Sequence, residues 1–428
     1  MNPSSLQDPF VMNLKRVVVT GIGALTPIGN NVAEYWGSLL KGVSGAGHIS
    51  YFNTEKFKTR IACQLKGYTP TDHFTTKELS KLDRSSQYAL LSTAEALDDA
   101  HFDWNRLDRD RVGVVFGTGI GGLTSSEEAV QQFMLQDRAP RFSPYHLLRV
   151  LANTVAGSIA LKYGFTGPNY ITTSACASSA NAIADACYAI AIGKSDVVVT
   201  GGTESAIIEL AVGGFNAMRA LSTRNDDPER ASRPFDRDRD GFVMGEGAGT
   251  LILESLDHAQ ARDARIYAEV VGVGMSADIY NIVAPDPEGA AAVKSMEGAL
   301  RSADLCPEDV DYINTHGTST PLGDLSECRA IAKVFGDHAP KLAINSTKSM
   351  TGHLLGAGPA VESVAIFCSM RDSLVHPTIN LDHLDPLIPS RWNFVPGEAI
   401  SREVKVVMTN SFGFGGHNVS LLYKKFEE

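Results

Sequence analysis

The sequence predicts a largely parallel α/β fold made of two similar halves. Segments typical of buried strands alternate with segments of helical spacing along the chain, an order that produces sheets with helices on their faces. The second half also repeats the first. Residues 266–274 repeat the strand-into-glycine pattern of residues 17–23, and residues 342–368 repeat the strand, loop and helix of residues 171–192. The two halves are expected to meet near residues 255–265.

The length of the chain supports this division. At 428 residues it is too long for one small core. We expect residues 1–11 to form a tail outside the fold, because they lack any pattern and precede a second methionine. Residues 12–262 are then the N-terminal half, and residues 263–428 the C-terminal half.

The first half contains the more varied set of elements. A β-branched run from Lys15 to Thr20 predicts a strand, and residues 32–41 predict a helix ending near a glycine. Residues 233–239 alternate Arg and Asp, which is typical of a solvated loop. The other elements expected in this half are one long helix at 76–100, strands at 111–116, 171–176, 196–200 and 250–254, and helices within 124–161 and 177–192.

The second half is expected to carry strands near residues 266–274, 310–314 and 342–346, a long helix ending near 368, and late strands at 404–410 and 419–423. Glycine- and threonine-rich loops follow several of these strands. Because such loops come at the carboxyl ends of strands, they are candidates for a functional site.

Composition excludes several classes of function. Hydrophobic residues make up 43% and charged residues 20% of the chain, as in an ordinary globular protein. The formal net charge of −11 argues against bulk nucleic-acid binding. The six cysteines lack the spacing of a zinc site or a disulfide framework, which fits a reducing cytoplasm. No apolar run approaches the ~18 residues of a membrane span.

Cys176 is the candidate nucleophile. It lies in Ile171-Thr-Thr-Ser-Ala-Cys-Ala-Ser-Ser179, where a strand is expected to end and a helix to begin. Unpaired backbone N–H groups and the positive end of the helix dipole at such a junction stabilise a thiolate. The alternative is a small buried core cysteine, the commoner case for this residue type.

Three later loops, each after a predicted strand, carry the remaining chemistry. They are Asn314-Thr-His-Gly-Thr-Ser-Thr-Pro321, Asn345-Ser-Thr-Lys-Ser-Met-Thr-Gly-His353 and Asn410-Ser-Phe-Gly-Phe-Gly-Gly416. We expect them to converge with Cys176. Each histidine alone could be only a structural hydrogen-bonding group, and the glycine-rich segment could be only a turn.

Together these groups suit acyl transfer. A thiolate accepts an acyl group from a thioester, and two neutral imidazoles donate N–H groups to a developing enolate or oxyanion. Backbone N–H groups of Cys176 and of the glycine-rich turn would form the oxyanion hole. Lys348 raises the local positive potential, and if it is buried it needs a carboxylate, for which Glu362 is the candidate.

These motifs resemble those of the β-ketoacyl-[acyl-carrier-protein] synthases, most closely the elongating type II enzymes of bacterial fatty-acid synthesis. Thr173-Ser-Ala-Cys-Ala-Ser and the three later loops carry the resemblance, with support from residues 219–225 and 232–242. It spans about Val17 to Lys424. The resemblance implies the thiolase fold, in which two similar α/β halves form five layers, α-β-α-β-α, and usually a homodimer.

The resemblance also implies a function. Cys176 would take an acyl chain from an acyl carrier protein. Malonyl-carrier protein would then lose CO₂, and its enolate, held by His316 and His353, would attack the thioester. The product is a 3-oxoacyl-carrier protein two carbons longer. The implied partners are therefore the acyl and malonyl forms of the carrier protein, with no nucleic acid, no membrane and no cofactor.

Further site residues follow from the resemblance only. Lys348 would order the site with Glu362 as its partner, and Phe414 would share the oxyanion hole with Cys176. Thr318 and Thr320 would hold the pantetheine amides, and residues 412–416, beginning at Phe412, would form a mobile gate. Ile120 and Phe215 would line the acyl pocket. The carrier protein would dock on Lys77, Lys81 and Arg219.

Two departures and several alternatives remain. His417 stands where the family pattern has Thr, and Ser80 stands where a basic residue is expected. A polyketide ketosynthase subunit would share every motif. An initiating enzyme would use Asn in place of His353, and a thiolase would carry a second cysteine in the late glycine-rich motif. A non-catalytic chain-length partner would lack the nucleophile.

Overall fold

The structure, a computed structural model, describes residues 14–427. The predicted tail, residues 1–11, lies outside the described residues. Ten strands form the main sheet in the order β10-β9-β13-β14-β8-β1-β7-β6-β4-β5. Read outward from its middle, this order is the same in both directions, with β8 corresponding to β1, β14 to β7 and β13 to β6. The repeat predicted from the sequence is therefore present in the topology.

Each half of the sheet contains five strands. The first half comprises β1 (Val17–Leu25), β4 (Val112–Gly117), β5 (Asn169–Thr172), β6 (Val197–Glu204) and β7 (Gly247–Ser255). The second half comprises β8 (Ala268–Ala277), β9 (Tyr312–Asn314), β10 (Ala343–Asn345), β13 (Val406–Gly413) and β14 (His417–Lys425). Only two residue pairs, Val18 with Glu269 and Val19 with Ala268, join β1 to β8, so the sheet is nearly divided there.

The prediction of a largely parallel sheet is wrong. In the first half β4 pairs in parallel with β5 and β6, but β7 is antiparallel to both β6 and β1. The second half repeats this arrangement, because β9 is parallel to β10 and β13 whereas β14 is antiparallel to β13 and β8. The three residues between β13 and β14 are too few for a parallel crossover, so this pair is a hairpin.

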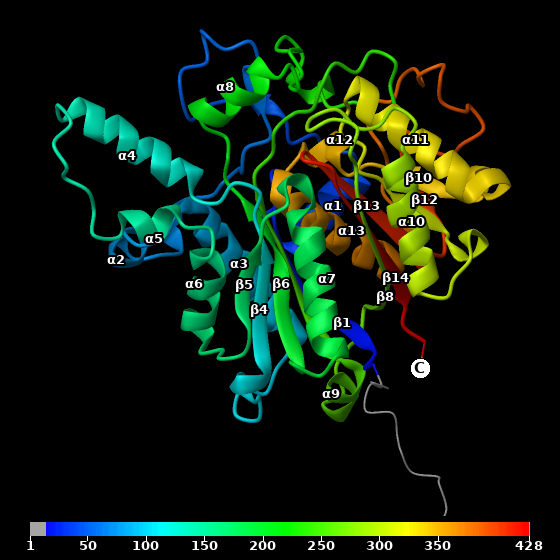
Figure 1. Cartoon of the computed structure of the whole chain (residues 1–428), viewed down its shortest axis with the longest axis horizontal. Helices are drawn as coiled ribbons and strands as arrows, with labels where there is room; N and C mark the ends of the chain where they lie inside the picture. Colours follow the sequence, from blue (N-terminus) through cyan, green and yellow to red (C-terminus); the bar gives the residue numbers. More distant parts are fainter. Residues whose placement is uncertain (1–13, 428) are drawn as a thin grey trace, which may run out of the picture.

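The helices complete five layers (Figure 1). On the outer face of the first half lie α3 (Arg84–Ala100) and α6 (Thr154–Tyr163), and α10 (Ala290–Ser302) and α11 (Pro321–Phe335) cover the second half. Between the two halves of the sheet lie α7 (Ser178–Ala191) and α13 (Gly358–Asp372), each of which contacts strands of both halves. The predicted α-β-α-β-α arrangement is confirmed.

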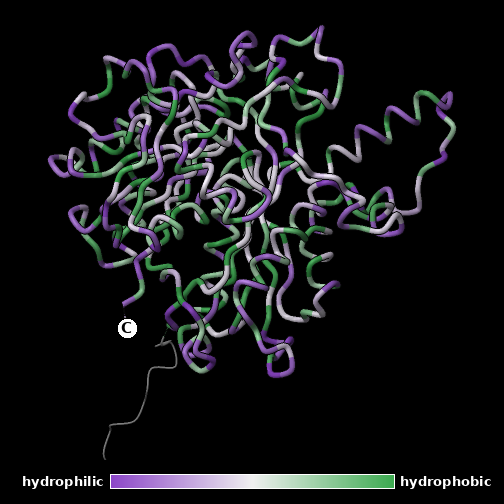
Figure 2. Tube along the Cα trace, turned by 180° about the vertical axis from the view of Figure 1, so that it is seen from behind, coloured by the Kyte–Doolittle hydropathy of each residue, from purple (hydrophilic) through white to green (hydrophobic). Residues whose placement is uncertain are grey.

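The remaining helices lie around these layers. They are α1 (Val32–Leu40), α2 (Thr76–Leu79), α4 (Leu123–Leu135), α5 (His146–Val150), α8 (Glu209–Ala217), α9 (Leu256–Ala261) and α12 (Lys348–Thr351), and two small hairpins pair β2 (Gly47–His48) with β3 (Ile61–Ala62) and β11 (Leu374–Val375) with β12 (Ile400–Ser401). Helix α4 projects from the body as an arm (Figures 1 and 2). No helix among residues 14–427 is both long enough and apolar enough to cross a membrane.

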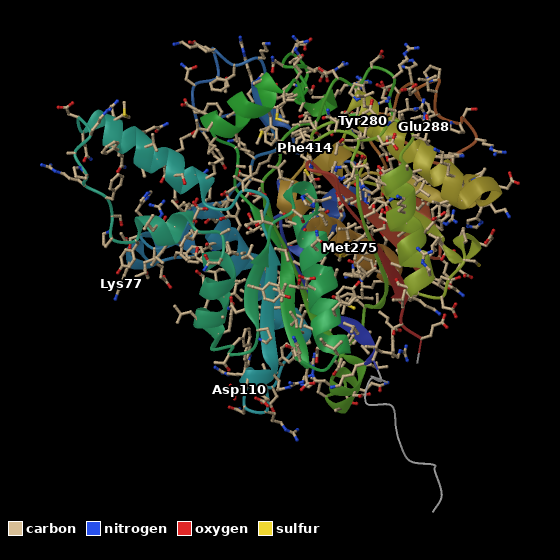
Figure 3. The ribbon with its side chains drawn as sticks, in the orientation of Figure 1. Lys77, Asp110, Met275, Tyr280, Glu288 and Phe414 are labelled. Atoms are coloured by element: carbon tan, nitrogen blue, oxygen red, sulfur yellow. The ribbon has the colours of Figure 1, made fainter. Side chains whose placement is uncertain are left out.

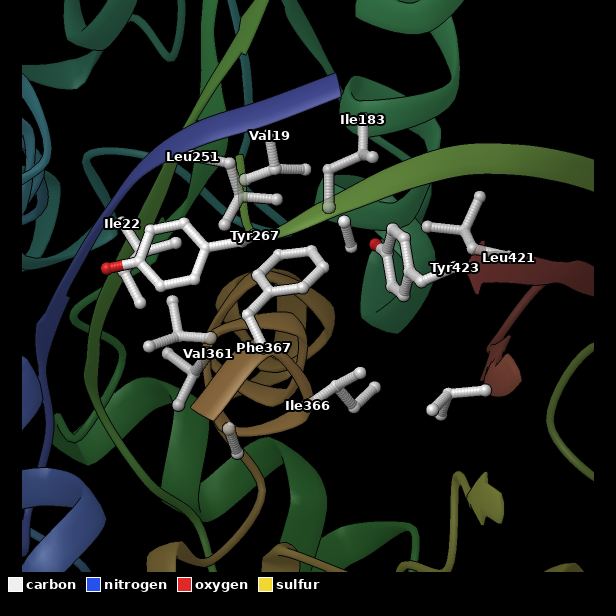
Figure 4. Packing of buried hydrophobic residues seen from close by; sticks show 14 of the residues in the cluster. Val19, Ile22, Ile183, Leu251, Tyr267, Val361, Ile366, Phe367, Leu421 and Tyr423 are labelled. Atoms are coloured by element: carbon white, nitrogen blue, oxygen red, sulfur yellow. The ribbon is translucent and has the colours of Figure 1, made fainter. Parts of the chain in front are cut away.

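The core between the sheets explains why the central helices are apolar. Every residue of α13 from Gly358 to Met370 is buried, and a helix with apolar residues on all its faces requires such an interior place, although Glu362 is buried among them. Phe367 of α13 packs against Tyr423 of β14, with ring centroids 4.8 Å apart, and faces Tyr267 at 6.4 Å (Figure 4). Apolar segments run through the middle of both halves, and polar segments lie mainly in the outer loops (Figure 2).

The single helix predicted for residues 76–100 is wrong, because the segment forms two helices, α2 and α3. Thr75 and Glu78 form a capping box on the short first helix. Asp83 then begins the second helix by accepting a hydrogen bond from the Ser85 N–H. The carboxylate of Asp83 also accepts from Ser125, so a tertiary contact favours this break. The amphipathic spacing of the segment did not reveal this cap.

Residues 233–239 were predicted to be a solvated loop, and this is wrong for all of them except Arg237 and Asp238. Arg233 pairs with Asp236 at 3.1 Å, and the two side chains are 4% and 0% exposed. Arg239 pairs with Asp385 at 2.8 Å and lies 3.6 Å from Asp324. Arg233, Asp236 and Arg239 therefore belong to buried ion pairs, whereas Arg237 and Asp238 are exposed.

Replacement of Arg239 with alanine is expected to lower the free energy of unfolding by about 3–5 kcal/mol, because it leaves buried carboxylates unpaired. Arg237 is the matched control, since its side chain is 53% exposed and reaches only its neighbour Asp238. Urea unfolding of Arg239→Ala and Arg237→Ala measures the difference in their free energies of unfolding. Equal stability of the two variants would show that the buried pairs carry no net stabilisation.

Candidate active site

The four loops that follow β5, β9, β10 and β13 meet at one cavity. They carry Cys176, His316, His353 and Phe414, and all four residues line this cavity. The predicted convergence of the four motifs is therefore present. Figure 3 shows Phe414 at this cavity and Asp110 at the opposite end of the N-terminal half.

Cys176 is presented by a sharp turn. Strand β5 ends at Thr172, four residues before the cysteine, which lies in a 3-10 turn (Ala175–Ala177) that leads into α7. Ala175 has a φ of 50°, a left-handed conformation that costs energy for a residue with a Cβ. Ser178 supports the turn, because its Oγ accepts from the Ser174 N–H and donates to the Ala175 carbonyl.

The environment of the thiol corrects one expectation. Burial raises the pKa of Cys176 to about 12, although Lys348 and the backbone N–H groups of Phe414 and Cys176 act in the opposite direction. The thiol is 6% exposed and belongs to an apolar cluster. The stabilised thiolate expected from the strand–helix junction is therefore wrong for the resting site. Burial outweighs the positive groups, and the sulfur carries its proton at neutral pH.

His353 is oriented towards this sulfur. Its Nε2 lies 3.1 Å from Sγ of Cys176, and its Nδ1 accepts a hydrogen bond from the Leu355 N–H at 3.3 Å. Burial, with a contribution from Lys348, holds the pKa of His353 well below its usual value. The ring is therefore neutral, and because Nδ1 is an acceptor, the proton is on Nε2, facing the cavity.

His316 is the second imidazole of the site. Its ring lies 5.3 Å from that of His353, at an interplanar angle of 86°. Burial, with Lys348 and His353 nearby, holds the pKa of His316 well below its usual value. Two neutral imidazoles thus face one cavity, an arrangement that can donate two N–H groups to one oxygen.

Lys348 and Glu362 form the expected buried pair. Lys348 Nζ donates to the Glu362 carboxylate, and both side chains are nearly inaccessible to solvent. Burial raises the pKa of Glu362, and the lysine opposes this effect. Because Lys348 also lowers the pKa of Cys176 and of both histidines, it contributes positive potential without touching the sulfur.

Several predicted site residues also line this cavity. Thr318 and Thr320 line it, and their hydroxyls lie 3.0 Å apart. Phe412 and Phe414 also line it, and the ring of Phe412 lies 5.8 Å from that of His316. Residues 414–416 form the tight turn of the β13–β14 hairpin, which leads directly to the exposed His417.

Other predicted site residues lie outside this cavity. Phe215 packs beside it, with its ring 6.4 Å from Phe414, in the apolar cluster that contains Cys176. Ile120 is 37% exposed and lines neither the cavity nor that cluster. Lys77, Lys81 and Arg219 are exposed. Figure 3 shows Lys77 well apart from Phe414.

Two residues that support the site were missed from the sequence. Glu327 is a buried carboxylate in α11 that accepts hydrogen bonds at 2.9 Å from the backbone N–H groups of His316 and Gly317. Asn410 donates to the same carboxylate at 3.1 Å. For Glu327, the signal available in the sequence was an acidic residue on the buried face of a helix. Among residues 14–427, no group of three or more His, Cys, Asp or Glu side chains is placed to hold a metal ion.

Removal of the lysine's charge is expected to slow alkylation of Cys176. In the double variant Lys348→Met/Glu362→Gln the thiol loses the positive group that lowers its pKa, so less thiolate is present at a given pH. A loss of one neighbouring charge shifts a pKa by roughly one unit, which predicts about tenfold slower reaction with iodoacetamide near pH 9. Mass spectrometry of the cysteine peptides measures the rate.

The exposed Cys306 is an internal control, because it lies by Asp309 and outside the cavity. Its alkylation rate should be unchanged in the double variant. Equal alkylation rates of Cys176 in the wild type and the double variant would show that Lys348 does not act on the thiol.

Two repeated halves with a thiol and two neutral imidazoles in one cavity define a thiolase-like fold with a cysteine-centred site. Sequence models of the family match residues 14–259 as "Beta-ketoacyl synthase, N-terminal domain" and residues 267–382 as "Beta-ketoacyl synthase, C-terminal domain". The chain belongs to the β-ketoacyl synthase family. The resemblance stated from the motifs is confirmed.

Curated relatives are similar over nearly the whole chain. Proteins named 3-oxoacyl-[acyl-carrier-protein] synthase 2 from Synechocystis sp. and from Staphylococcus aureus strain COL are each 47% identical over 414 residues, which is 96% of this chain and 99% of each relative.

Solved structures agree with this assignment. A β-ketoacyl synthase from Burkholderia phymatum is 34% identical with a TM-score of 0.89, and the match covers 97% of this chain and all of that one. A type II polyketide ketosynthase, solved in complex with its acyl-carrier protein and bound to the hexaketide, is 32% identical with a TM-score of 0.90 and the same coverage.

Proposed function

We propose that this protein catalyses the decarboxylative Claisen condensation of a Cys176-bound acyl chain with malonyl-acyl carrier protein in fatty-acid chain elongation. The observation that carries the proposal is the convergence of one thiol and two neutral imidazoles in a single cavity. His353 Nε2 lies 3.1 Å from the sulfur, and the His316 ring lies beside that of His353.

In the first half-reaction, Cys176 attacks the thioester of an acyl-carrier protein. A bond forms between Sγ and the acyl carbon, the bond to the pantetheine sulfur breaks, and the thiol proton passes to the departing sulfur. Because burial raises the pKa of Cys176 to about 12, this proton must leave as the attack proceeds. The N–H groups of Phe414 and Cys176 hold the tetrahedral oxyanion.

In the second half-reaction, malonyl-carrier protein occupies the cavity. The bond to its carboxylate breaks and CO₂ leaves, and the electron pair passes to the thioester as an enolate. His316 and His353 stabilise the enolate oxygen by N–H donation. Its carbon then attacks the acyl-Cys176 thioester, and the sulfur leaves as a thiolate that takes a proton.

The partner is an acyl carrier protein in its acyl and malonyl forms, in agreement with the names of the 47% identical relatives. We assign binding of the pantetheine amides to Thr318 and Thr320, which line the cavity. We assign docking of the acidic carrier to the exposed Lys77, Lys81 and Arg219, assign the acyl pocket to Ile120 and Phe215, and expect a homodimer. We also propose that the N-terminal half ends at residue 262 and the C-terminal half begins at residue 263, and that the protein is located in the cytoplasm.

A polyketide ketosynthase subunit is the second candidate, because solved structures of that class match at 32% identity. The 47% identity to 3-oxoacyl-[acyl-carrier-protein] synthases favours fatty-acid elongation. A non-catalytic chain-length partner is disfavoured, since the nucleophile and both histidines are present.

The proposal is tested by incubating the protein with malonyl-carrier protein and a series of acyl-carrier proteins from short to long chains. CO₂ release together with a 3-oxoacyl-carrier protein two carbons longer than the acyl donor is the expected result. Acyl-carrier proteins left intact across the whole series would reject the function. Use of a growing polyketide in place of saturated chains would favour the second candidate.

A further inference from the structure

Glu204 is a buried carboxylate beside the site for which the condensation described above has no role. It is the last residue of β6, and its side chain is inaccessible to solvent. Oε2 accepts hydrogen bonds from the N–H groups of Gly119 at 2.8 Å and Gly356 at 3.0 Å. Oε1 accepts from the Ile120 N–H and the Thr118 hydroxyl, both at 3.3 Å. Four donors from two loops thus meet on one carboxylate.

Activation of the thiol does not explain this carboxylate. Its negative charge raises the pKa of Cys176 and therefore opposes thiolate formation. Within residues 14–427, no lysine, arginine or histidine forms an ion pair with Glu204. Burial raises the pKa of Glu204 itself to about 7, whereas its hydrogen bonds lower it. The hydrogen bonds from the surrounding backbone account for an acidic side chain at this buried position.

One of these backbone groups belongs to the turn that controls His353. Leu355 has a φ of 48°, and in this conformation its N–H reaches Nδ1 of the histidine. The next N–H along the chain, that of Gly356, donates to Glu204. The two loops are in close contact, because a Cβ on Gly356 would lie 2.2 Å from the Gly119 nitrogen.

We propose that Glu204 is a positioning residue for the condensation. By holding the Gly356 N–H it maintains the turn in which Leu355 donates to Nδ1 of His353, and this keeps the imidazole proton on Nε2, where it faces Cys176 and the enolate. Through Gly119 it also ties this turn to the loop after β4. The catalytic role of this proton rests on the proposed function. Its location on Nε2 does not depend on that function.

Replacement of Glu204 with glutamine should disturb this arrangement. All four partners point donors at the carboxylate, and an amide offers one acceptor oxygen and turns an NH₂ group towards the remaining donors. The turn at Leu355 then loosens and His353 populates its other tautomer. Decarboxylation of malonyl-carrier protein is expected to fall roughly tenfold or more, as for small displacements of reacting groups. Acylation of Cys176, which does not use this proton, should fall by a smaller factor.

Glu95 provides the matched control. It lies on α3, outside the cavity, and its carboxylate also accepts from two backbone N–H groups, those of Ala24 at 2.8 Å and Val32 at 2.7 Å. Burial likewise raises its pKa. Glu95→Gln is expected to lower stability without changing the ratio of decarboxylation to acylation. Thr118→Val removes only one donor from Glu204 and should show a smaller selective loss, which provides a test if Glu204→Gln does not fold.

The tautomer is measured directly by nitrogen NMR of protein labelled at histidine, with His353→Ala used for assignment. Wild-type protein should show Nε2 protonated, and Glu204→Gln a mixture. A proton on Nδ1 in the wild type, an unchanged tautomer in both Glu204→Gln and Thr118→Val, or equal loss of the two half-reactions in those variants would overturn the positioning role. Absence of both half-reactions in the wild type would instead reject the proposed function, and the tautomer would still decide the role of Glu204.

Discussion

Replacement of Cys176 with alanine is expected to abolish condensation and to leave decarboxylation of malonyl-carrier protein measurable. The alanine side chain cannot form the thioester, so condensation should fall on the order of 10⁶-fold, as for removal of a catalytic nucleophile. The two imidazoles remain in place, because His353 is also held by the hydrogen bond from Leu355. The protein should therefore still release CO₂ without forming a carbon–carbon bond.

The measurement follows CO₂ and 3-oxoacyl product in parallel for the wild type and the variant. Cys187→Ala is the control, because this cysteine is buried in α7 and does not line the cavity. It should retain condensation. Residual condensation by Cys176→Ala at more than a small fraction of the wild-type rate would mean that another group holds the acyl chain.

Replacement of His316 or His353 with alanine is expected to slow decarboxylation by roughly 10²–10³-fold, the cost of losing one donor to a developing oxyanion. Acylation of Cys176 should fall less, because we assign its oxyanion to the backbone N–H groups of Cys176 and Phe414. Both rings are neutral, with pKa values held well below the usual value, so each loss is that of an N–H donor and not of a positive charge.

Single-turnover acylation and CO₂ release separate the two half-reactions for each histidine variant. His338 provides the control, since its Nε2 forms a hydrogen bond with the Val310 carbonyl and it does not line the cavity. Substitution of His338 should change neither rate selectively. Equal losses of acylation and decarboxylation in the His316 and His353 variants would contradict the assigned division of roles.

The repeat and the convergence of the four loops could be predicted from the sequence for a physical reason. Strand patterns and glycine-rich loops are local features, and loops after parallel strands lie at one edge of a sheet. His316, Lys348 and His353 each followed such a strand. The antiparallel pairs were not predictable in the same way, because strand direction depends on where the intervening chain passes.

Long-range contacts account for the remaining errors. Asp83 divides the predicted helix at 76–100 because it meets Ser125, forty-two residues away. The charges of residues 233–239 find partners near Asp324 and Asp385. The pKa of Cys176 depends on burial by distant segments, which outweighs the local effect of the helix. In each case the sequence neighbourhood suggested one environment and the tertiary structure supplied another.

The central claim is that Cys176 holds the acyl chain, and mass spectrometry tests it most directly. The protein is incubated with a long-chain acyl-carrier protein, digested, and examined for the acyl mass on each of the cysteine peptides. The predicted result is one acyl group on the Cys176 peptide, lost when malonyl-carrier protein is added. An adduct on any other residue, or none while condensation proceeds, would contradict the account.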